Sequence, residues 1–262
     1  MRIALGIEYD GTRYHGWQIQ KNIITIQKIL EKCLSIIANE KITVYCSGRT
    51  DSKVHSLGQV VHFDTKSIRK EKSWILGTNS YLPNDISVIW AKEVPYSFHA
   101  RHSATYRHYR YIINNSSYKS VFFINNFYNF KKKKLDEKRM NESVKCLIGQ
   151  HDFSSFRSKN CQSTVSIRYV FNTKVYRINS FVIFDIIANS FLYNMVRNIA
   201  SIIIKIGCKE KKIYWIKELL VAKKNNFLYG PSDPSGLYLI YVKYPKFFKF
   251  PKFIYKNIIN IF

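Results

Sequence analysis

Residues 47–63 read SGRTDSKVHSLGQVVHF, a polar loop followed by an apolar stretch, and apolar residues also precede the loop. Such a loop, anchored between two strands, can hold a carboxylate at the mouth of a cleft. Arg49 and Asp51 stand two positions apart, so both can face the same side of an extended segment. Aspartate is also an ordinary turn residue. By itself, the loop therefore reads as a turn closed by Asp51, with Arg49 as its ion-pair partner.

Outward from this loop, the sequence predicts strands and helices in alternation. The expected strands are 3–9, 42–46, 58–63, 86–94, 106–113, 167–176, 181–187 and 237–242; the expected helices are 25–38, 71–80, 135–148, 191–205 and 211–222. Residues 178–180 should form the turn of a hairpin. Strands adjacent in hairpins, with helices between them, predict an α+β fold with mainly antiparallel sheets. The order of elements suggests two similar α/β subdomains, 1–104 and 105–262.

The composition favours a folded protein that binds a polyanion. Hydrophobic residues make up 46% of the 262 residues, too many for a disordered chain. Lys and Arg exceed Asp and Glu by 42 to 17, a net charge of +25. Nucleic acid is the usual partner of so basic a protein. The lysine run at 131–134 is interpreted as a solvated cluster. The Lys, Phe and Tyr residues from Tyr244 onward are suited either to base stacking or to packing on the core.

The cysteines and the apolar segments indicate a reduced, cytoplasmic protein without a membrane span. Five cysteines without a CxxC pair argue against a disulfide framework and against a zinc ribbon. The most apolar stretch, 181–206, is interrupted by charged and amide residues that a membrane span would not carry. Charges near the amino terminus do not fit a signal peptide. His55 and His62 near Asp51 match no common zinc spacing, and His62 is expected to be a core residue.

Further motifs occur in a fixed order along most of the chain. They are Tyr9-Asp10-Gly11-Thr12, Tyr14, Gly16-Trp17-Gln18 and Gln20, then the loop at 48–55, Gly58-Gln59-Val60 and His62-Phe63, then Phe98-His99-Ala100-Arg101, Ala104, Arg107 and Tyr109-Arg110-Tyr111, then Gly149, His151-Asp152-Phe153 and Phe156-Arg157, then Ala188, Phe191-Leu192, Met195-Val196-Arg197-Asn198-Ile199 and Gly236-Leu237-Tyr238-Leu239. Together they resemble the TruA-type family of tRNA pseudouridine synthases. Several ordered motifs are far more specific than one short motif.

The resemblance implies a pseudouridine synthase fold and the isomerisation of uridine in the tRNA anticodon stem-loop, at positions 38, 39 and 40. The N1–C1′ bond breaks and a C5–C1′ bond forms, so neither a metal nor a redox cofactor is required. Asp51 matches the family's nucleophile, which attacks either the base or the sugar. Arg197 matches the arginine that pairs with this carboxylate and keeps it ionised. Tyr109 matches the tyrosine that stacks on the extruded uracil and assists loss of the C5 proton.

Other residues are candidate RNA contacts. Arg49 matches the family's arginine that holds the RNA with its base extruded, and a paired uridine must leave the stack before it can react. Lys53 and Arg101 are candidate phosphate contacts, with surface solvation as the equal alternative. Ser52-Lys53 stands where the family has Ala-Gly, and we expect the change to be tolerated. The family commonly forms a homodimer.

Two other functions remain open from the sequence. A non-catalytic tRNA-binding protein or RNA chaperone would use the same basic and aromatic composition. It would not explain why Asp51, Arg49, Tyr109 and Arg197 occur together. A metal-dependent nuclease needs several clustered carboxylates, for which the sequence offers no clear set.

Overall fold

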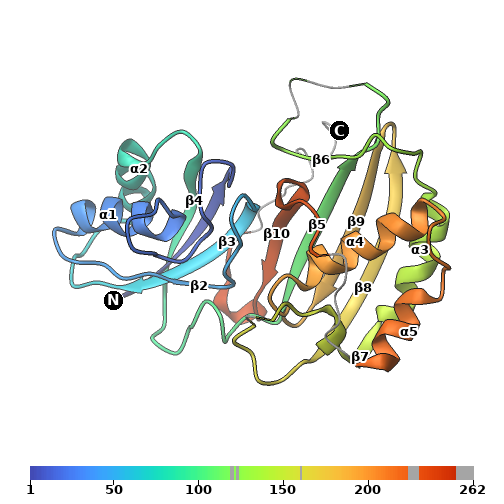
Figure 1. Ribbon diagram of the computed structural model, residues 1–262. Helices are drawn as coiled ribbons and strands as arrows, with labels where there is room; N and C mark the ends of the chain where they lie inside the picture. The colour runs from blue at the N-terminus through green and yellow to red at the C-terminus, as the bar shows by residue number, and fades with distance from the viewer. Residues whose placement is uncertain (119–120, 122–123, 160, 224–229, 252–262) are drawn as a thin grey trace. The chain divides into compact units, whose positions relative to one another are not determined.

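The computed structural model describes residues 1–118, 121, 124–159, 161–223 and 230–251. The chain forms two compact units. The first holds Met1–Thr105 together with the segment that begins at Tyr238, and the second holds Tyr106–Leu237. Each unit carries a sheet with helices packed against it (Figure 1).

The sheet of the first unit is mainly antiparallel. Its elements are β1 (Arg2–Tyr9), α1 (Ile26–Ala38), β2 (Tyr45–Cys46), β3 (His55–Asp64), α2 (Glu71–Tyr81), β4 (Ile86–Val94) and, from Tyr238 onward, β10 (Leu237–Lys243). The strand order is β4-β1-β3-β10, and β2 pairs with β3. Strand β1 runs antiparallel to both of its neighbours, whereas β10 runs parallel to β3.

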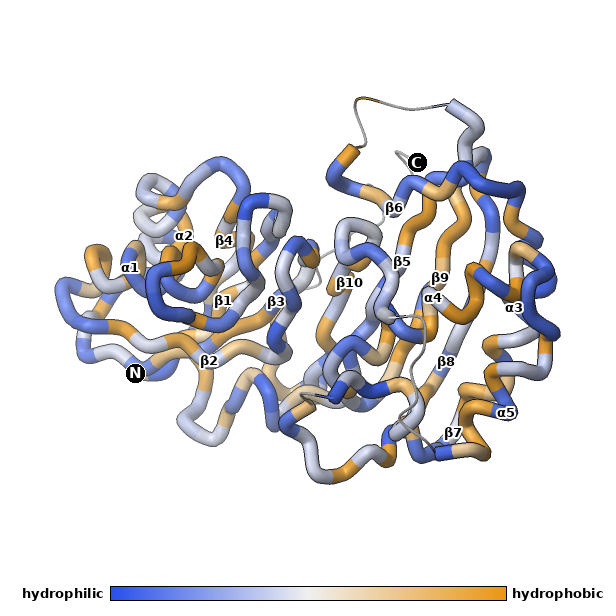
Figure 2. Tube along the Cα trace, viewed as in Figure 1, coloured by the Kyte–Doolittle hydropathy of each residue, from blue (hydrophilic) through white to orange (hydrophobic). Residues whose placement is uncertain are grey.

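The core of the first unit lies between its sheet and its two helices. Ile3, Leu5 and Ile7 alternate along β1, and all three are buried against the helices. The apolar face predicted for the helix at 25–38 is confirmed, because Leu30 and Leu34 are fully buried in the same cluster. Figure 2 shows hydrophobic colouring along these strands and hydrophilic loops between them. Because side chains alternate across a strand, one sheet face suffices to bury this set.

The sheet of the second unit is also mainly antiparallel. Its elements are β5 (Tyr106–Asn114), β6 (Tyr128–Asn129), α3 (Glu137–Val144), β7 (Gly149–Asp152), β8 (Ile167–Ile178), β9 (Phe181–Ala188), α4 (Met195–Gly207) and α5 (Trp215–Ala222). The strand order is β5-β9-β8-β7, and β6 pairs in parallel with β5. The predicted hairpin is confirmed as β8 and β9, with Asn179 in its turn at φ +52°. Asparagine is one of the few residues that adopt this left-handed conformation readily.

Helix α4 is the most buried helix of the second unit. Its buried residues are Met195, Val196, Asn198, Ile199, Ala200, Ile202, Ile203, Ile204, Ile206 and Gly207. Gly207 adjoins Met140 of α3, and a Cβ at Gly207 would lie 2.7 Å from the Met140 sulfur. The two helices therefore pack closely, as helix-covered sheets require.

Several predicted elements are shorter than expected. The strand expected at 42–46 comprises Tyr45–Cys46 alone; the helix expected at 135–148 ends at Val144 and is followed by a 3-10 turn; and the helix expected from 211 begins at Trp215. The helix expected from 191 begins at Met195, because Asn194 has φ +60°, which α-helical geometry excludes. Strands β6 and β7 were not predicted, since two to four mixed residues carry almost no periodicity.

The carboxy-terminal segment differs from the expected division at 104. The segment from Tyr238 lies with the first unit, because β10 pairs with β3 and the Tyr244 hydroxyl donates to the Ala100 carbonyl at 2.6 Å. The rings of Tyr244, Phe248 and Phe250 pack on Phe98 at centroid distances of 5.2, 5.0 and 5.2 Å. In the described part of this tail, packing on the core is therefore confirmed. Residues 252–262 lie outside the described residues.

One prediction about the surface is borne out by the described part of the chain. The lysines at 131–134 are all exposed, as a solvated cluster should be. Among the described helices, none combines the length and the hydropathy that are needed to cross a membrane.

Candidate functional site

The loop of residues 47–54, here called the Asp51 loop, joins β2 to β3. These strands pair antiparallel, and the Ser47 N–H extends the pairing by donating to the Val60 carbonyl at 2.8 Å. Within the loop, Asp51 is half-buried and Arg49 is exposed. A carboxylate on a loop anchored at both ends in a sheet is held in place while remaining partly accessible.

The opening segment, residues 9–18, holds the Asp51 loop through main-chain hydrogen bonds. The Trp17 N–H donates to the Thr50 carbonyl at 3.0 Å, and the Lys53 N–H donates to the Tyr14 carbonyl at 3.1 Å. The Ser52 hydroxyl also donates to the Tyr14 carbonyl, at 3.2 Å. The residues on both sides of Asp51 are thus tied to one neighbouring segment.

Two glycines of the opening segment are required by this close approach. Gly16 has φ +88°, and a Cβ on it would lie 2.8 Å from the Thr50 carbonyl oxygen. A Cβ on Gly11 would lie 2.1 Å from the Val54 carbonyl oxygen. Neither carbonyl can move without moving the loop, so a side chain at either glycine would displace it.

Buried polar side chains of the neighbouring strands hold the loop through hydrogen bonds. The hydroxyls of Tyr9 and Thr50 lie 2.8 Å apart. The Gln59 amide donates to the Gly48 carbonyl at 2.8 Å and accepts from the Ser47 hydroxyl at 2.6 Å. Burial raises the pKa of Tyr9 far above its usual value, so its hydroxyl stays neutral. These bonds satisfy buried polar groups and fix the backbone before Asp51.

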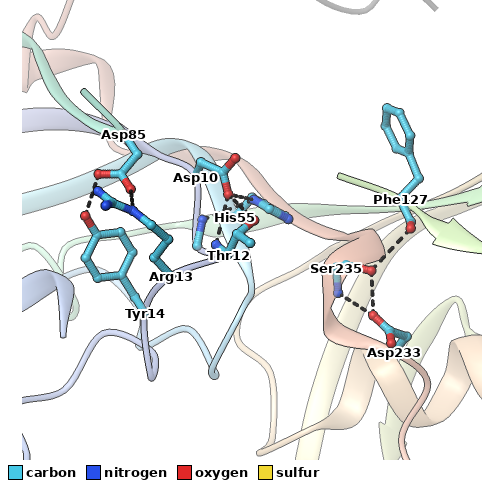
Figure 3. Close-up of polar contacts among 10 residues, drawn as sticks. Asp10, Thr12, Arg13, Tyr14, His55, Asp85, Phe127, Asp233 and Ser235 are labelled. Atoms are coloured by element: carbon cyan, nitrogen blue, oxygen red, sulfur yellow. Dashed lines mark hydrogen bonds and ion pairs between the residues drawn. The ribbon is translucent and has the colours of Figure 1, made fainter. Parts of the chain in front are cut away.

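The turn after β1 is tied to the residue that follows the loop. His55 Nδ1 accepts from the Gly11 N–H at 3.1 Å and lies 3.1 Å from Asp10 Oδ1 (Figure 3). Thr12 donates to the same carboxylate from its N–H at 2.9 Å. Burial would raise the pKa of Asp10, but the nearby His55 ring and hydrogen bonds from Thr12 outweigh it and hold the pKa well below its usual value. Asp10 is therefore ionised and has a structural task in this turn.

Lys53 occupies the position where glycine was expected. It is exposed and adopts φ +63°, the left-handed region that glycine favours. The loop therefore keeps the backbone conformation that suits glycine, although a side chain there adds strain. The Lys53 N–H still makes its bond to the opening segment.

Tyr109 lies on β5 of the second unit and is 92% buried, with 8% exposed. It stands opposite Ile186 of β9, and its ring meets the Phe191 ring edge-on at 5.0 Å. The sheet and the Phe191 ring therefore fix the plane of the tyrosine ring.

Arg197 lies in the first turn of α4 and is half-buried. Its Nε donates to the Ser232 carbonyl at 2.8 Å, and its Nη1 donates to Asn194 Oδ1 at 3.0 Å. Ser232 in turn donates to the Arg197 carbonyl from its N–H at 3.2 Å and from its hydroxyl at 3.0 Å. The guanidinium is thus oriented by two polar groups. Asp51 and Arg197 belong to different units, so their pairing stays a prediction.

The segment at 231–236 was assigned no functional residue from the sequence, yet it positions Arg197 through Ser232. The Asp233 carbonyl accepts from the Tyr111 hydroxyl at 2.7 Å. The Asp233 carboxylate accepts from the Ser235 N–H at 2.9 Å, and the Ser235 hydroxyl donates to the Phe127 carbonyl at 3.2 Å (Figure 3). The sequence did hold a signal for a segment that positions Arg197, because an arginine inside an apolar helix needs hydrogen-bond acceptors nearby.

The histidines and cysteines near the loop do not form a metal centre. Among the described residues, no three His, Cys, Asp or Glu side chains are grouped closely enough to hold a metal ion. His62 is a core residue as predicted: it is 1% exposed, and its Nδ1 accepts from the Ala100 N–H at 3.2 Å. Burial lowers the pKa of His62 to about 4, so the ring is neutral. All five cysteines are free thiols.

Comparisons with known proteins place the chain in one family. The family model described as tRNA pseudouridine synthase matches residues 6–103 and 144–245. The chain is 50% identical over 250 residues to a protein of Buchnera aphidicola subsp. Baizongia pistaciae named tRNA pseudouridine synthase A, covering 95% of this chain and 94% of the relative. It is 49% identical over 252 residues to the protein of that name from Pseudoalteromonas atlantica, covering 96% and 95%.

Among solved structures, the likeness is weaker. A chain in the structure of an H/ACA RNP bound to a substrate RNA containing 2′-deoxyuridine matches with a TM-score of 0.35 and 13% identity. The match covers 78% of this chain and 42% of that one.

Proposed function

Because the chain belongs to the tRNA pseudouridine synthase family, we propose that it isomerises uridine in the anticodon stem-loop of tRNA, at positions 38, 39 and 40. The observation that carries the proposal is the Asp51 loop. Its backbone is tied to the opening segment on both sides of Asp51, and the carboxylate is half-buried rather than enclosed. Such a preorganised carboxylate suits covalent chemistry on a bound nucleotide.

The reaction moves one bond within the substrate. The N1–C1′ bond breaks, the uracil turns, and C5 bonds to C1′; the C5 proton leaves and N1 gains a proton. In our proposal, Asp51 acts as the nucleophile toward either the base or the ribose. No atom of a cofactor is needed for this balance.

The other side chains have assigned roles in this proposal. Arg197 pairs with the carboxylate and keeps it ionised; its orientation by Ser232 and Asn194 supports that role. Tyr109 stacks on the uracil and assists loss of the C5 proton. Arg49 holds the RNA while the base is extruded.

RNA binding is proposed to draw on the exposed basic residues. Arg49, Lys53 and Arg101 are all exposed and lie in the first unit. Their contacts with phosphates would release counterions, so the Kd for tRNA should rise steeply with salt.

We further propose that the enzyme is cytoplasmic and works as a homodimer. A candidate surface for the partner subunit lies on the second unit. Ile167, Tyr169 and Phe171 alternate on one face of β8, and their side chains are 50%, 43% and 45% exposed. Exposed apolar groups gathered in one place are typical of interaction surfaces.

The test is pseudouridine formation without added metal or cofactor. Purified protein is incubated with unmodified tRNA that carries anticodon-stem uridines, with EDTA present, and products are mapped by chemical adduct and primer extension. The unmutated chain should form pseudouridine at one or more of positions 38, 39 and 40. Asp51→Asn should bind the tRNA equally well and form none.

The matched control is Asp64→Asn, which removes an exposed carboxylate that pairs with Arg2 at 2.8 Å. This variant should keep full activity, since an exposed ion pair contributes little. Tight tRNA binding without pseudouridine from the unmutated chain would favour the non-catalytic tRNA-binding protein. Full activity of Asp51→Asn would remove Asp51 from its assigned role.

A further inference from the structure

Tyr45 is a large aromatic side chain that the fold holds in place without covering it. It stands on the short strand β2, opposite His62 of β3, and remains 52% exposed. Its ring stacks on the His62 ring, with 5.1 Å between centroids and 24° between planes. Since His62 is buried and neutral, one face of Tyr45 rests on a rigid support.

Two further rings adjoin this pair. The centroid of the His99 ring lies 5.9 Å from that of Tyr45 and 4.6 Å from that of His62. The centroid of the His102 ring lies 4.4 Å from that of His99, and His102 is exposed. His99 is fixed by its turn, because its Nδ1 accepts from the Arg101 N–H at 3.1 Å and its N–H donates to the Ser103 hydroxyl at 2.9 Å.

The surroundings of Tyr45 carry positive charge. The Arg101 N–H is bonded to His99, and Arg49 follows Tyr45 by four residues at the start of the Asp51 loop; both arginines are exposed. Tyr45 also stands six residues before Asp51 in the same strand-loop segment. Exposed aromatic rings and arginines on neighbouring segments are the usual arrangement for binding single-stranded RNA.

One face of the Tyr45 ring rests on His62, and half of the Tyr45 surface faces solvent, so the ring is accessible to a ligand. A ring that is supported on one face loses less conformational entropy when a ligand stacks on it.

We propose that Tyr45, with His99 and His102 beside it, is a stacking site for one unpaired base of the bound RNA. Arg49 and Arg101 bind phosphates next to that nucleotide. The identity of the ligand as RNA rests on the proposed function, and the base is a different one from the uridine that reacts.

The test measures binding of an anticodon-arm RNA by Tyr45→Leu, made on Asp51→Asn so that no turnover occurs. Leucine keeps an apolar cover over His62 but offers no aromatic face. The Kd should rise about tenfold, the size expected for losing one base–aromatic stack. Tyr45→Phe should bind as the parent does. The matched control is Tyr81→Leu, at a tyrosine that is 56% exposed at the end of α2 and should leave the Kd unchanged.

Abasic nucleotides identify the stacked base. A single abasic nucleotide is placed at each position of the RNA in turn. At one position it should raise the Kd of the parent about tenfold and leave the Kd of Tyr45→Leu unchanged. Such a coupling is not expected if Tyr45 is merely structural. A Kd for Tyr45→Leu within twofold of the parent would overturn the proposal, as would equal abasic effects in both proteins.

A measurement on the unmutated chain guards against a variant that fails to fold. RNA carrying 5-iodouridine at each loop position in turn is irradiated in the complex, and one position should crosslink to Tyr45. Crosslinks that never map to Tyr45 would refute the site. Binding that depends on Tyr45 without any pseudouridine formation would refute the proposed function and leave the stacking site standing.

Discussion

The Asp51 loop and the surroundings of Arg197 hold their key side chains in different ways. The loop is held through its backbone, by main-chain hydrogen bonds to the opening segment and by close contact with Gly16. Arg197 is held through its side chain, by Asn194 and the Ser232 carbonyl. A change beside the loop therefore moves several residues together, whereas a change beside Arg197 frees one guanidinium. The expected effects of substitution differ accordingly.

The largest effect is expected at Gly16. In Gly16→Ala, the new Cβ would meet the Thr50 carbonyl at 2.8 Å in a backbone conformation that alanine disfavours. The backbone must shift beside Asp51, and a displacement of about 1 Å costs on the order of a hundredfold in rate. We expect kcat on tRNA to fall at least about a hundredfold, measured under single-turnover conditions.

Gly230→Ala is the matched control for this prediction. Gly230 also has positive φ, at +66°, but an added Cβ would meet nothing within 4 Å. It should lose about 1 kcal/mol of stability from strain alone and keep most of its activity. Equal losses of kcat in both variants would mean that close contact with the loop is unimportant.

The free energy of unfolding should depend on pH through protonation of His62, on the strand that follows the loop. Burial lowers its pKa to about 4, so below about pH 6.5 the unfolded chain binds a proton at His62 while the folded chain does not. Its contribution is full above pH 6.5 and is lost as the pH falls toward 4. We expect a loss of about 2 kcal/mol between pH 7 and pH 5, measured as the urea midpoint times the m-value.

His62→Asn keeps an acceptor for the Ala100 N–H but cannot titrate in this range. Its stability should be lower at pH 7 and should change less than that of the parent between pH 7 and pH 5. The prediction fails if the two proteins show the same slope.

A smaller effect is expected beside Arg197. Asn194→Gly keeps the left-handed backbone at φ +60° but removes the acceptor for Arg197 Nη1. The bond from Nε to the Ser232 carbonyl remains, so kcat should fall by about tenfold with little change in the melting temperature. Asn179→Gly, in the β8–β9 turn at φ +52°, is the control and should keep its activity. An unchanged kcat in Asn194→Gly would show that the Asn194 acceptor is not needed to position the guanidinium.

The smallest effect is expected at Lys53, where substitution by glycine tests whether the backbone of the Asp51 loop is strained. Lys53→Gly relieves a left-handed conformation at φ +63° and also loosens the unfolded chain. These effects oppose each other, and we expect a net gain of about 0.5 kcal/mol by thermal unfolding, with kcat retained and a higher Kd for tRNA because a phosphate contact is lost. Lys41→Gly, at an exposed lysine without positive φ, should be neutral or destabilising. A loss of stability in Lys53→Gly would show that the strain at Lys53 is smaller than the cost of loosening the unfolded chain.

The elements that the sequence predicted well are those with long periodic patterns. Strand β4 has the predicted bounds, Ile86–Val94, and the β8–β9 hairpin turns at Asn179 as expected. Predictions were poorer where few residues decide the structure. The start of α4 was placed four residues early, because the pattern of Phe191 and Leu192 continues a helical face and the left-handed Asn194 leaves no signal in periodicity.

The candidate site was predicted only in part. Asp51, Tyr109 and Arg197 came from ordered motifs, and their catalytic roles stay predictions. Sequence reasoning missed Ser232, because it acts on Arg197 through its main-chain carbonyl and any residue type can supply that atom. It also missed Tyr45, because exposure and ring stacking depend on the pairing of β2 with β3.

By itself, the sequence determined the class of fold, the family, and the identity of the residues that carry chemical groups, because periodicity and ordered motifs are written in side chains. Only the tertiary structure decided why Gly11 and Gly16 accompany Asp51, what orients Arg197, and where Tyr45 is supported. These features depend on distances between segments far apart in the chain. Such distances are set by packing and by main-chain hydrogen bonds, which residue identity alone does not encode.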